Sequence, residues 1–241
     1  MERDATKMRG ILAWRGVRLR RVEGHADPDA GPRQVALPAA WEQAAADALA
    51  ALAPGEGAVS LPAAAEAWIR PIAERAKRAG IEEDIGCALH ALLAARRGAP
   101  GEAVWQGIAT PRPGFVLSLP AFHDAELGFD AEGFAQAAGL AVRALTLAVP
   151  SAPRLAVGMA DLSGLLARLG LAYDSVAARD VAKCLAALLT ASAGLASAEM
   201  AERFGTVVQA APARLAPAAC VLAGLAEAAR TVQLAAAAKP A

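Results

Sequence analysis

The stretch "LAVGMADLSGLLARLGLAYDS", residues 155–175, carries several signals that decide the local fold. Its segment "AVGMADLSGLLARLG" predicts a helix over residues 156–170, because leucines recur at helical spacing and form one apolar face that can enter a core. The leucines of that face are Leu162, Leu165, Leu166 and Leu169.

The end of the same stretch predicts a helix stop followed by a helix start. Gly170 is suited to a left-handed C-cap, which glycine adopts at little cost. Asp174 and Ser175 then offer side-chain oxygens to the N–H groups of the next helix. We expect the ring of Tyr173 to pack at this corner. The run that follows predicts a long helix ended by Gly205.

The composition favours closely packed helices. The chain has 241 residues, of which 56% are hydrophobic, while aromatic residues make up only 4%. The mean hydropathy is +0.35, and much of it comes from alanine, a strong helix former with little area to bury. We therefore expect a mainly α, multi-helix domain with a small β-hairpin near the N-terminus.

The charge balance and the cysteines restrict the class of protein. Lys+Arg and Asp+Glu both number 24, which argues against a nucleic-acid-binding protein. Three widely spaced cysteines without a C-x-x-C pattern favour a cytoplasmic location. The charged N-terminus lacks a signal peptide's apolar core. The apolar run after Arg214 contains Glu227 and Arg230, so a soluble helix is favoured over a membrane span.

Residues 1–40 look β-like, and helices dominate afterwards. "GVRLRRV" and "RQVALP" predict the two strands of a hairpin. A helix is expected over residues 38–53, and Ser60 is expected to cap the next one, with Gly80 at its end. The apolar face of that second helix comprises Trp68, Ile69, Ile72 and Ala76.

Later segments alternate between helices and short irregular pieces. "EEDIGCALHALLAARRG" predicts a helix, "APGEAVWQGIATPRPG" a loop and "FVLSLPAF" a short strand. Asp130 is expected to cap a helix that ends before Pro150. We expect one domain over residues 1–241, with helical regions at residues 41–110 and 115–205 and a C-terminal helix at residues 215–237.

One helix carries a weak metal-binding pattern. Asp84, Cys87 and His90 lie on one face of the predicted third helix, and His123 beside Asp124 is a candidate ligand from another segment. The alternative is a buried cysteine and a half-exposed histidine without metal, and we favour this alternative.

Other candidate residues have structural explanations. Ser118 lacks a nucleophile elbow and an evident His/Asp partner, which favours a polar strand residue. Arg96 and Arg97 follow a helix end, where the helix dipole explains them. Most of the tryptophans are expected to be core anchors, but Trp105 in its Pro/Gly loop is a candidate to line a groove.

Residues 115–205 resemble the large subunit of ribonucleotide reductase, especially its cobalamin-dependent class II type. "LSLPAF", "FDAEGFAQAAGLAVRAL", "RLAVGMADLSGLLARLGLAYDS" and "LASAEMAERFG" follow the family's order of elements. The resemblance implies a piece of an enzyme barrel, with cobalamin or a nucleotide as a possible ligand. It also implies a cysteine thiyl radical between an asparagine two residues before it and a glutamate two residues after it.

The sequence differs from the family at the positions of the catalytic residues. Cys87 is the only cysteine before "LSLPAF", and Ile85 and Leu89 stand where asparagine and glutamate are needed. Leu117 stands at the second redox cysteine position. No Ser/Thr-rich phosphate loop or C-terminal cysteine pair follows. The resemblance therefore implies a relative without its catalytic residues.

Other family positions differ as well. Asp161 stands where the family usually has glycine, and Gly164 stands where it often has aspartate. Thr146 and Pro150 lie in a helix end that is usually acidic, and "ATPRPGF" replaces the neighbourhood of the radical loop.

These observations leave three hypotheses in order of preference. The first is a non-catalytic ribonucleotide reductase relative that acts as a binding or scaffold module. The second is a contributing subunit of a split cobalamin-dependent reductase, whose partner chain supplies the radical cysteine and the phosphate loop. The third is a small metal-dependent enzyme. A reductase partner chain and a homodimer are both possible assemblies, whereas nucleic acid and membrane are not expected.

Overall fold

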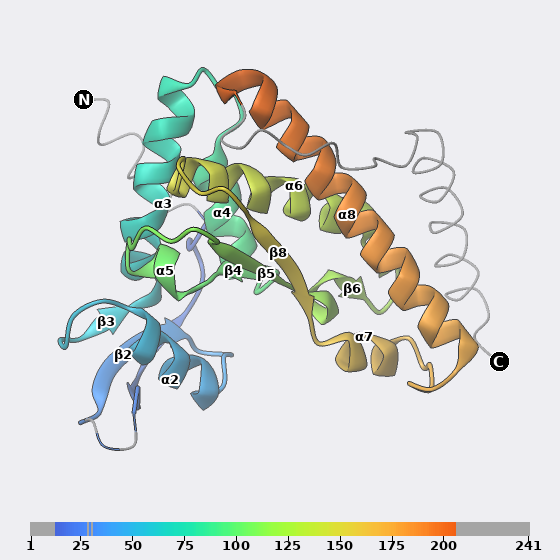
Figure 1. The fold of residues 1–241 in the computed structure, drawn as a ribbon. Helices are drawn as coiled ribbons and strands as arrows, with labels where there is room; N and C mark the ends of the chain where they lie inside the picture. Colours follow the sequence, from blue (N-terminus) through green and yellow to red (C-terminus); the bar gives the residue numbers. More distant parts are fainter. Residues whose placement is uncertain (1–12, 28, 30, 206–241) are drawn as a thin grey trace.

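The computed structural model describes residues 13–27, 29 and 31–205. Helices account for most of the ordered backbone, and the strands form three small sheets (Figure 1). The helices are α2 (Gln43–Leu52), α3 (Leu61–Arg78), α4 (Ile85–Ala94), α5 (Glu102–Trp105), α6 (Ala131–Ala148), α7 (Leu162–Arg168) and α8 (Val176–Phe204), with the 3₁₀ turn η1 (Leu119–Phe122). The strands are β1 (Leu19–Gly24), β2 (Arg33–Pro38), β3 (Val59–Ser60), β4 (Gly98–Pro100), β5 (Gly114–Ser118), β6 (His123–Asp124), β7 (Gly128–Phe129) and β8 (Ala156–Ala160).

The predicted N-terminal hairpin is confirmed. Strands β1 and β2 pair antiparallel, and β3 adds to β2 in parallel. Val35 and Leu37 of β2 are fully buried, in the alternation expected of a strand with one face on the core. The next helix, α2, begins at Gln43 rather than at residue 38, because strand pairing holds the chain extended through Pro38.

The start of α2 is tied to the end of α4 by a charged contact. The Arg96 guanidinium donates hydrogen bonds to both carboxylate oxygens of Glu42, Nη1 at 2.8 Å from Oε2, and lies 5.0 Å from the ring centroid of Trp41. Hydrogen bonding to Arg96 lowers the pKa of Glu42 below its ordinary value. Arg96 has a φ of +56° at the turn into β4, so its role is more specific than the expected interaction with a helix dipole.

The predicted helix caps of α3 and α6 are confirmed. The Ser60 hydroxyl accepts from the N–H of Ala63, and the Asp130 carboxylate accepts from the N–H of Gly133. Gly80, with a φ of +68°, follows the last residues of α3. The expected apolar face of α3 is buried along Trp68, Ile69, Ile72 and Ala76.

Helix α6 lies at the centre of the molecule. It packs against α8, α3, α4 and the β5–β8 sheet, and Figure 1 shows α8 running alongside it. Arg75 of α3 donates to the carbonyls of Leu147 and Ala148, which are left free at the C-terminal end of α6. The buried residues of α6 are Phe134, Ala137, Ala138, Gly139, Leu140, Ala141, Val142, Ala144, Leu145 and Leu147.

The second sheet corrects two predictions. Its order is β4–β5–β8, with β4 antiparallel and β8 parallel to β5. Residues 156–160 are therefore strand β8 rather than the first turns of a helix, because they pair with β5. The expected loop at residues 99–114 contains most of β4 and all of α5, whose pairing and packing partners lie elsewhere in the chain. The predicted strand "FVLSLPAF" ends at Ser118 and turns into η1.

Asp161 explains where β8 ends and α7 begins. Its φ of +61° lies in the left-handed region. Glycine adopts this conformation without a steric penalty, and aspartate tolerates it better than most other residues. Its carboxylate accepts from the N–H of Gly164 at 2.9 Å and so caps α7.

The turn into α8 is confirmed in part. Gly170 has a φ of +69°, and the Ser175 hydroxyl caps α8 by accepting from the N–H of Ala178. Asp174 contributes its backbone carbonyl, which accepts from Arg179, rather than its side chain. The expected packing of Tyr173 is wrong, since its side chain is 69% exposed. The buried side chains of α7 are instead those of Leu165 and Leu166.

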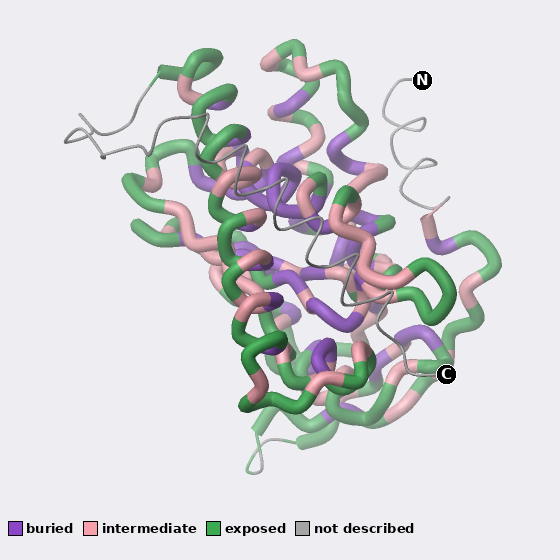
Figure 2. The backbone as a smooth tube through the Cα atoms, turned by 90° about the vertical axis from the view of Figure 1, so that its right-hand side faces the viewer, coloured by how far each residue is buried: buried purple, intermediate pink, exposed green. Residues whose placement is uncertain are grey.

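The fold contains both helices and small sheets, and helices hold more of the residues than strands do. Buried residues from Trp14 to Met200 form one continuous core, visible as the interior purple segments of Figure 2. The single-domain prediction for residues 1–241 stays a prediction. The expected helix over residues 215–237, which contains Cys220, lies outside the described residues.

Helix α8 is long and apolar enough to cross a membrane, by length and composition alone. Its most apolar window has a mean hydropathy of 1.5, and 17% of that window is buried. One such helix among the described residues is weak evidence for a span, because helices of soluble proteins pass the same test of length and composition, and one side of α8 packs along α6.

We predict that Asp161→Ala lowers the free energy of unfolding by about 1–3 kcal/mol, because it loses the cap of α7 and places alanine at a positive φ. Asp161→Asn is the matched control, since asparagine tolerates this φ and also caps helices, and it should stay within about 0.5 kcal/mol of wild type. Urea unfolding followed by tryptophan fluorescence measures both. Equal effects of the two substitutions would contradict this account of Asp161.

We predict that Glu42→Gln reduces the loss of stability on acidification. The lowered pKa means that ionised Glu42 stabilises the fold above its unfolded pKa and loses this contribution as pH falls through the folded value. The pair is solvent-exposed, so the difference between variant and wild type should be at most about 1 kcal/mol between pH 6 and 3. Thermal unfolding across this range tests it, with the exposed Glu56→Gln as control. Identical pH profiles for wild type and Glu42→Gln would refute the prediction.

Candidate functional site

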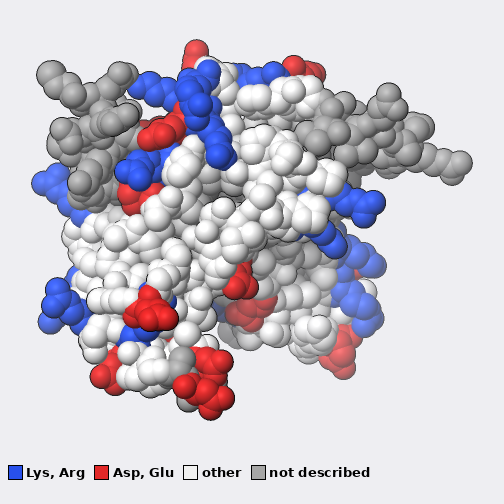
Figure 3. Space-filling view, turned by 60° about the vertical axis from the view of Figure 1, so that its left-hand side comes forward, with Lys and Arg blue, Asp and Glu red and all other residues white. Residues whose placement is uncertain are grey.

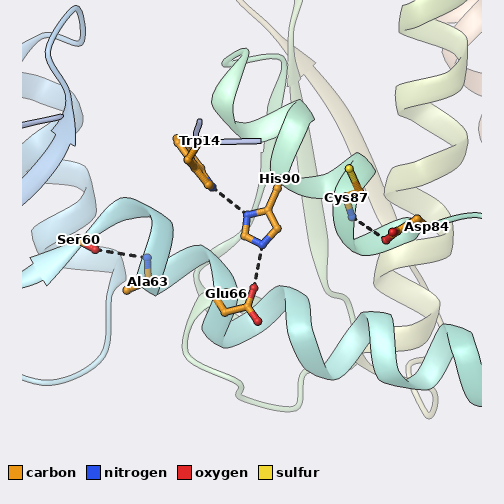
Figure 4. Close-up of polar contacts among 7 residues, drawn as sticks. All are labelled: Trp14, Ser60, Ala63, Glu66, Asp84, Cys87 and His90. Carbon is orange, nitrogen blue, oxygen red and sulfur yellow. Dashed lines mark hydrogen bonds and ion pairs between the residues drawn. The ribbon is translucent and has the colours of Figure 1, made fainter. Parts of the chain in front are cut away.

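The metal-site candidates of α4 are held by its N-terminal cap. The Asp84 carboxylate accepts from the backbone N–H of Cys87 at 3.0 Å (Figure 4). Cys87 therefore lies in the first turn of α4, and its side chain is half-buried. The expectation of a buried cysteine beside a half-exposed histidine is reversed, since His90 is only 2% exposed.

His90 is the one buried polar or charged residue in the described part of the chain, and both of its ring nitrogens are engaged. The indole N–H of Trp14 donates to Nδ1 at 3.1 Å, and Nε2 lies 3.0 Å from Oε2 of Glu66 (Figure 4). Because an indole can only donate, Nδ1 is the acceptor and Nε2 carries the proton that is donated to Glu66.

This network is structural in character. It ties the segment before β1, through Trp14, to α4 and α3, which carry His90 and Glu66. Neither ring nitrogen of His90 has a lone pair directed to open space, as a metal ligand requires. The sequence pattern revealed His90 but not its partners, which lie 76 and 24 residues away along the chain.

His123 lies in the two-residue strand β6, where it pairs with Phe129. The adjacent Asp124 accepts from the N–H groups of Glu126 and Leu127, which lower the pKa of its carboxyl group. Among residues 13–27, 29 and 31–205, no three His, Cys, Asp or Glu side chains lie together as a metal site requires. The structure thus does not assemble Asp84, Cys87, His90 and His123 into a metal centre.

Among the described residues, the β4–β5–β8 sheet has one face covered by helix α6 and an opposite face that is largely uncovered. Phe115 and Leu117 of β5 point to the covered face, where α6 packs, and they are 1% and 0% exposed. The next row across the sheet is Ala99, Val116 and Gly158, which are paired directly in register. Val116 is 48% exposed, and a Cβ added to Gly158 would meet no atom within 4 Å.

The uncovered face is therefore a small apolar platform. Its side chains alternate with those of the buried row, as strand geometry requires. Its remaining residues are Gly114, Ser118, Ala156 and Ala160. Ser118 lies on this strand, as predicted. The alternation of buried and exposed positions in "GFVLS" is the sequence signal that could have revealed the β5 part of this platform. The β8 part could not be foreseen, because residues 156–160 were predicted to be helical.

Trp105 lines a cavity, as the sequence predicted. Its ring is 5% exposed, its indole N–H donates to the carbonyl of Pro100 at 3.0 Å, and it meets Trp68 edge-on at 5.6 Å between centroids. The cavity beside these rings has a volume of about 490 Å³ and also contacts Arg75 and Ile108. This arrangement fits a core anchor that borders a cavity of mixed polar and apolar lining.

The surface charge shows no field of one sign on the face seen in Figure 3. Lysines and arginines alternate there with acidic residues around a broad uncharged area. This distribution agrees with the net charge of zero and gives no support to phosphate-backbone binding on that face.

Comparison with known families supports the relationship expected from the sequence. Residues 116–213 match the family described as "Ribonucleotide reductase, barrel domain", a match of less than half the chain. Curated proteins and solved structures gave no match. Within the described residues, the matched segment spans most of β5 and all of α6, β8, α7 and α8, so it includes two of the three strands of the sheet with the uncovered face but not β4.

We predict that His90→Leu lowers the free energy of unfolding by about 1–3 kcal/mol, because it leaves the Trp14 indole and the Glu66 carboxylate without their partner. His123→Leu is the matched control and should cost less, since His123 is partly exposed. Chemical unfolding followed by circular dichroism provides the comparison. A loss below about 0.5 kcal/mol for His90→Leu would show that the network does not hold the segment.

Proposed function

We propose that this chain is a non-catalytic relative of ribonucleotide reductase that acts as a binding or scaffold module. One observation carries the proposal: the chain has no cysteine between residues 88 and 183, a range that includes β5, β8 and the segments that join them. The resemblance implies a radical cysteine in the loop before the "LSLPAF" strand and a redox cysteine at the position of Leu117 in β5. Cys87 lies at the start of α4 and Cys184 within α8.

The uncovered sheet face supports a binding role. Strands that belong to a closed barrel have partners on both edges, and their inner face is enclosed. Here the matched segment retains two parallel strands and covers only one face with helices. An apolar platform of small residues remains for a ligand or another chain, with a nucleotide or a cobalamin-like molecule as the ligands that the resemblance suggests. We also propose a cytoplasmic location for the chain, because its three cysteines form no C-x-x-C pattern.

A second candidate function is a subunit of a split cobalamin-dependent reductase. The unpaired edge of β8 favours it, because a partner chain could extend the sheet there and bring the missing thiol and phosphate loop. Reductase activity that appears only when such a chain is added would support this candidate over the first.

We predict no deoxynucleotide formation when the purified chain is incubated with ribonucleotides, adenosylcobalamin and a dithiol reductant. An active ribonucleotide reductase assayed in parallel is the positive control. If product forms with the wild-type chain and is lost in the Cys87→Ser or Cys184→Ser variant, the non-catalytic proposal is contradicted.

We also predict that a nucleotide or a cobalamin raises the melting temperature of the chain. A ligand that binds only the folded state adds about 2.7 kcal/mol at a hundredfold excess over its Kd. Val116→Arg should abolish the shift by blocking the platform, whereas Leu127→Arg, at a site 89% exposed in the β6–β7 turn, should not. No shift with either ligand class would leave a protein-binding role and exclude small-molecule binding of this kind.

A further inference from the structure

Strand β8 presents an unpaired backbone edge. It is the last strand in the order β4–β5–β8, and the N–H of Ala156 donates towards β5, to the carbonyl of Pro113 at 3.0 Å. Since the direction of backbone groups alternates along a strand, Val157 and Met159 turn their N–H and C=O groups to the other edge. Within the described residues, no hydrogen bond reaches these four groups.

The edge lacks the features that normally prevent strands from pairing with other chains. Exposed edges are usually protected by charged residues, prolines or bulges. The sequence of β8 is "AVGMA", which contains neither a charge nor a proline, and its pairing with β5 is regular over all five residues. The central Gly158 has open space where its side chain would be.

We propose that β8 pairs antiparallel with β8 of a second copy of this chain, around a two-fold axis at Gly158. In this register, Val157 of one copy lies opposite Met159 of the other. Each such pair exchanges two N–H···O bonds, so all four outward-facing groups of each strand are satisfied. The two Gly158 residues lie opposite each other as a non-hydrogen-bonded pair. The Cα atoms of two strands are closest at such a pair, and the lack of a side chain on glycine avoids a clash there.

The residues that flank β8 have complementary charges in this arrangement. Arg154 precedes the strand and Asp161 follows it, and both are exposed. Antiparallel pairing about Gly158 places Arg154 of each copy within one residue of the level of Asp161 of the other. The same contact occurs twice, as a two-fold interface requires.

A second copy suits this edge better than an unrelated strand. The hydrogen-bonding groups, the central glycine and the flanking charges are all self-complementary about one point. The result is a six-stranded sheet, ordered β4–β5–β8–β8–β5–β4, that extends the uncovered face across both copies. This pairing does not depend on the absence of catalysis, so its failure is separate from that of the proposed function.

The first test is the mass of the full chain in solution, by sedimentation equilibrium. Wild type should be a dimer. Met159→Pro removes the outward N–H and should weaken dimerisation by roughly tenfold or more, with an unchanged circular dichroism spectrum. Met159→Ala is the matched control, because it shortens the same side chain, which packs partly against the core, but keeps the N–H. It should remain a dimer.

The second test is a cross-link, which holds even where Met159→Pro does not fold. Gly158→Cys should form a disulfide to residue 158 of the second copy, since the paired Cα atoms lie at about 4.5 Å. Ser118→Cys lies on the same sheet face but on the inner strand, roughly 20 Å from its counterpart (three strand spacings across and four residues along), and should not. Peptide mapping separates these disulfides from any formed by the native cysteines.

Three results would overturn the proposal. A monomeric wild type would mean that residues outside the described ranges cover the edge or that a different chain occupies it. A dimer equally stable in Met159→Pro would place the interface elsewhere. A dimer whose Gly158→Cys variant does not cross-link would exclude the two-fold pairing at Gly158.

Discussion

Burial of α6 from nearly every direction decides where the other elements lie. Residues 137–142 are buried without interruption, and six consecutive residues cover all sides of a helix. A helix of this kind must be enclosed, and α8, α3, α4 and the β5–β8 sheet enclose it. Alanine and glycine permit close approach, as at Gly139, where an added Cβ would lie 3.6 Å from that of Ala196 in α8.

The same constraint produces the asymmetry of the sheet. Helix α6 covers the face that bears Phe115 and Leu117, and among the described helices none covers the face that bears Val116. A closed barrel would enclose that second face, and the matched family is defined by such a barrel. Within the described chain, the matched segment therefore has a sheet face that is covered by a helix, while the opposite face and the β8 edge have no partner. This uncovered face supports the proposed binding role.

His90 shows how one sequence pattern can serve a different purpose. The spacing of Asp84, Cys87 and His90 places three polar side chains near one face of a helix, as a metal site would. In the fold, Asp84 caps the helix and His90 is enclosed by Trp14 and Glu66. Burial of an imidazole demands partners for both nitrogens, and these came from distant segments rather than from the helix itself.

The sequence by itself determined the features that depend on neighbouring residues. Caps such as Ser60, Asp130 and Ser175 and the stop at Gly170 follow from local hydrogen bonding and backbone freedom, so they were predictable. The helices α3, α6 and α8 followed from apolar spacing and length. The resemblance carried by residues 115–205 and the missing cysteines were also readable without coordinates.

Only the tertiary structure decided the features that depend on distant partners. The segment 156–160 is a strand because β5 offers it a parallel edge, although its apolar residues and the leucines after it suit a helix equally well. Strand β4 exists for the same reason. The exposure of Tyr173, the burial of His90 and the open edge of β8 likewise depend on which segments fill the adjacent space, and local sequence does not encode that.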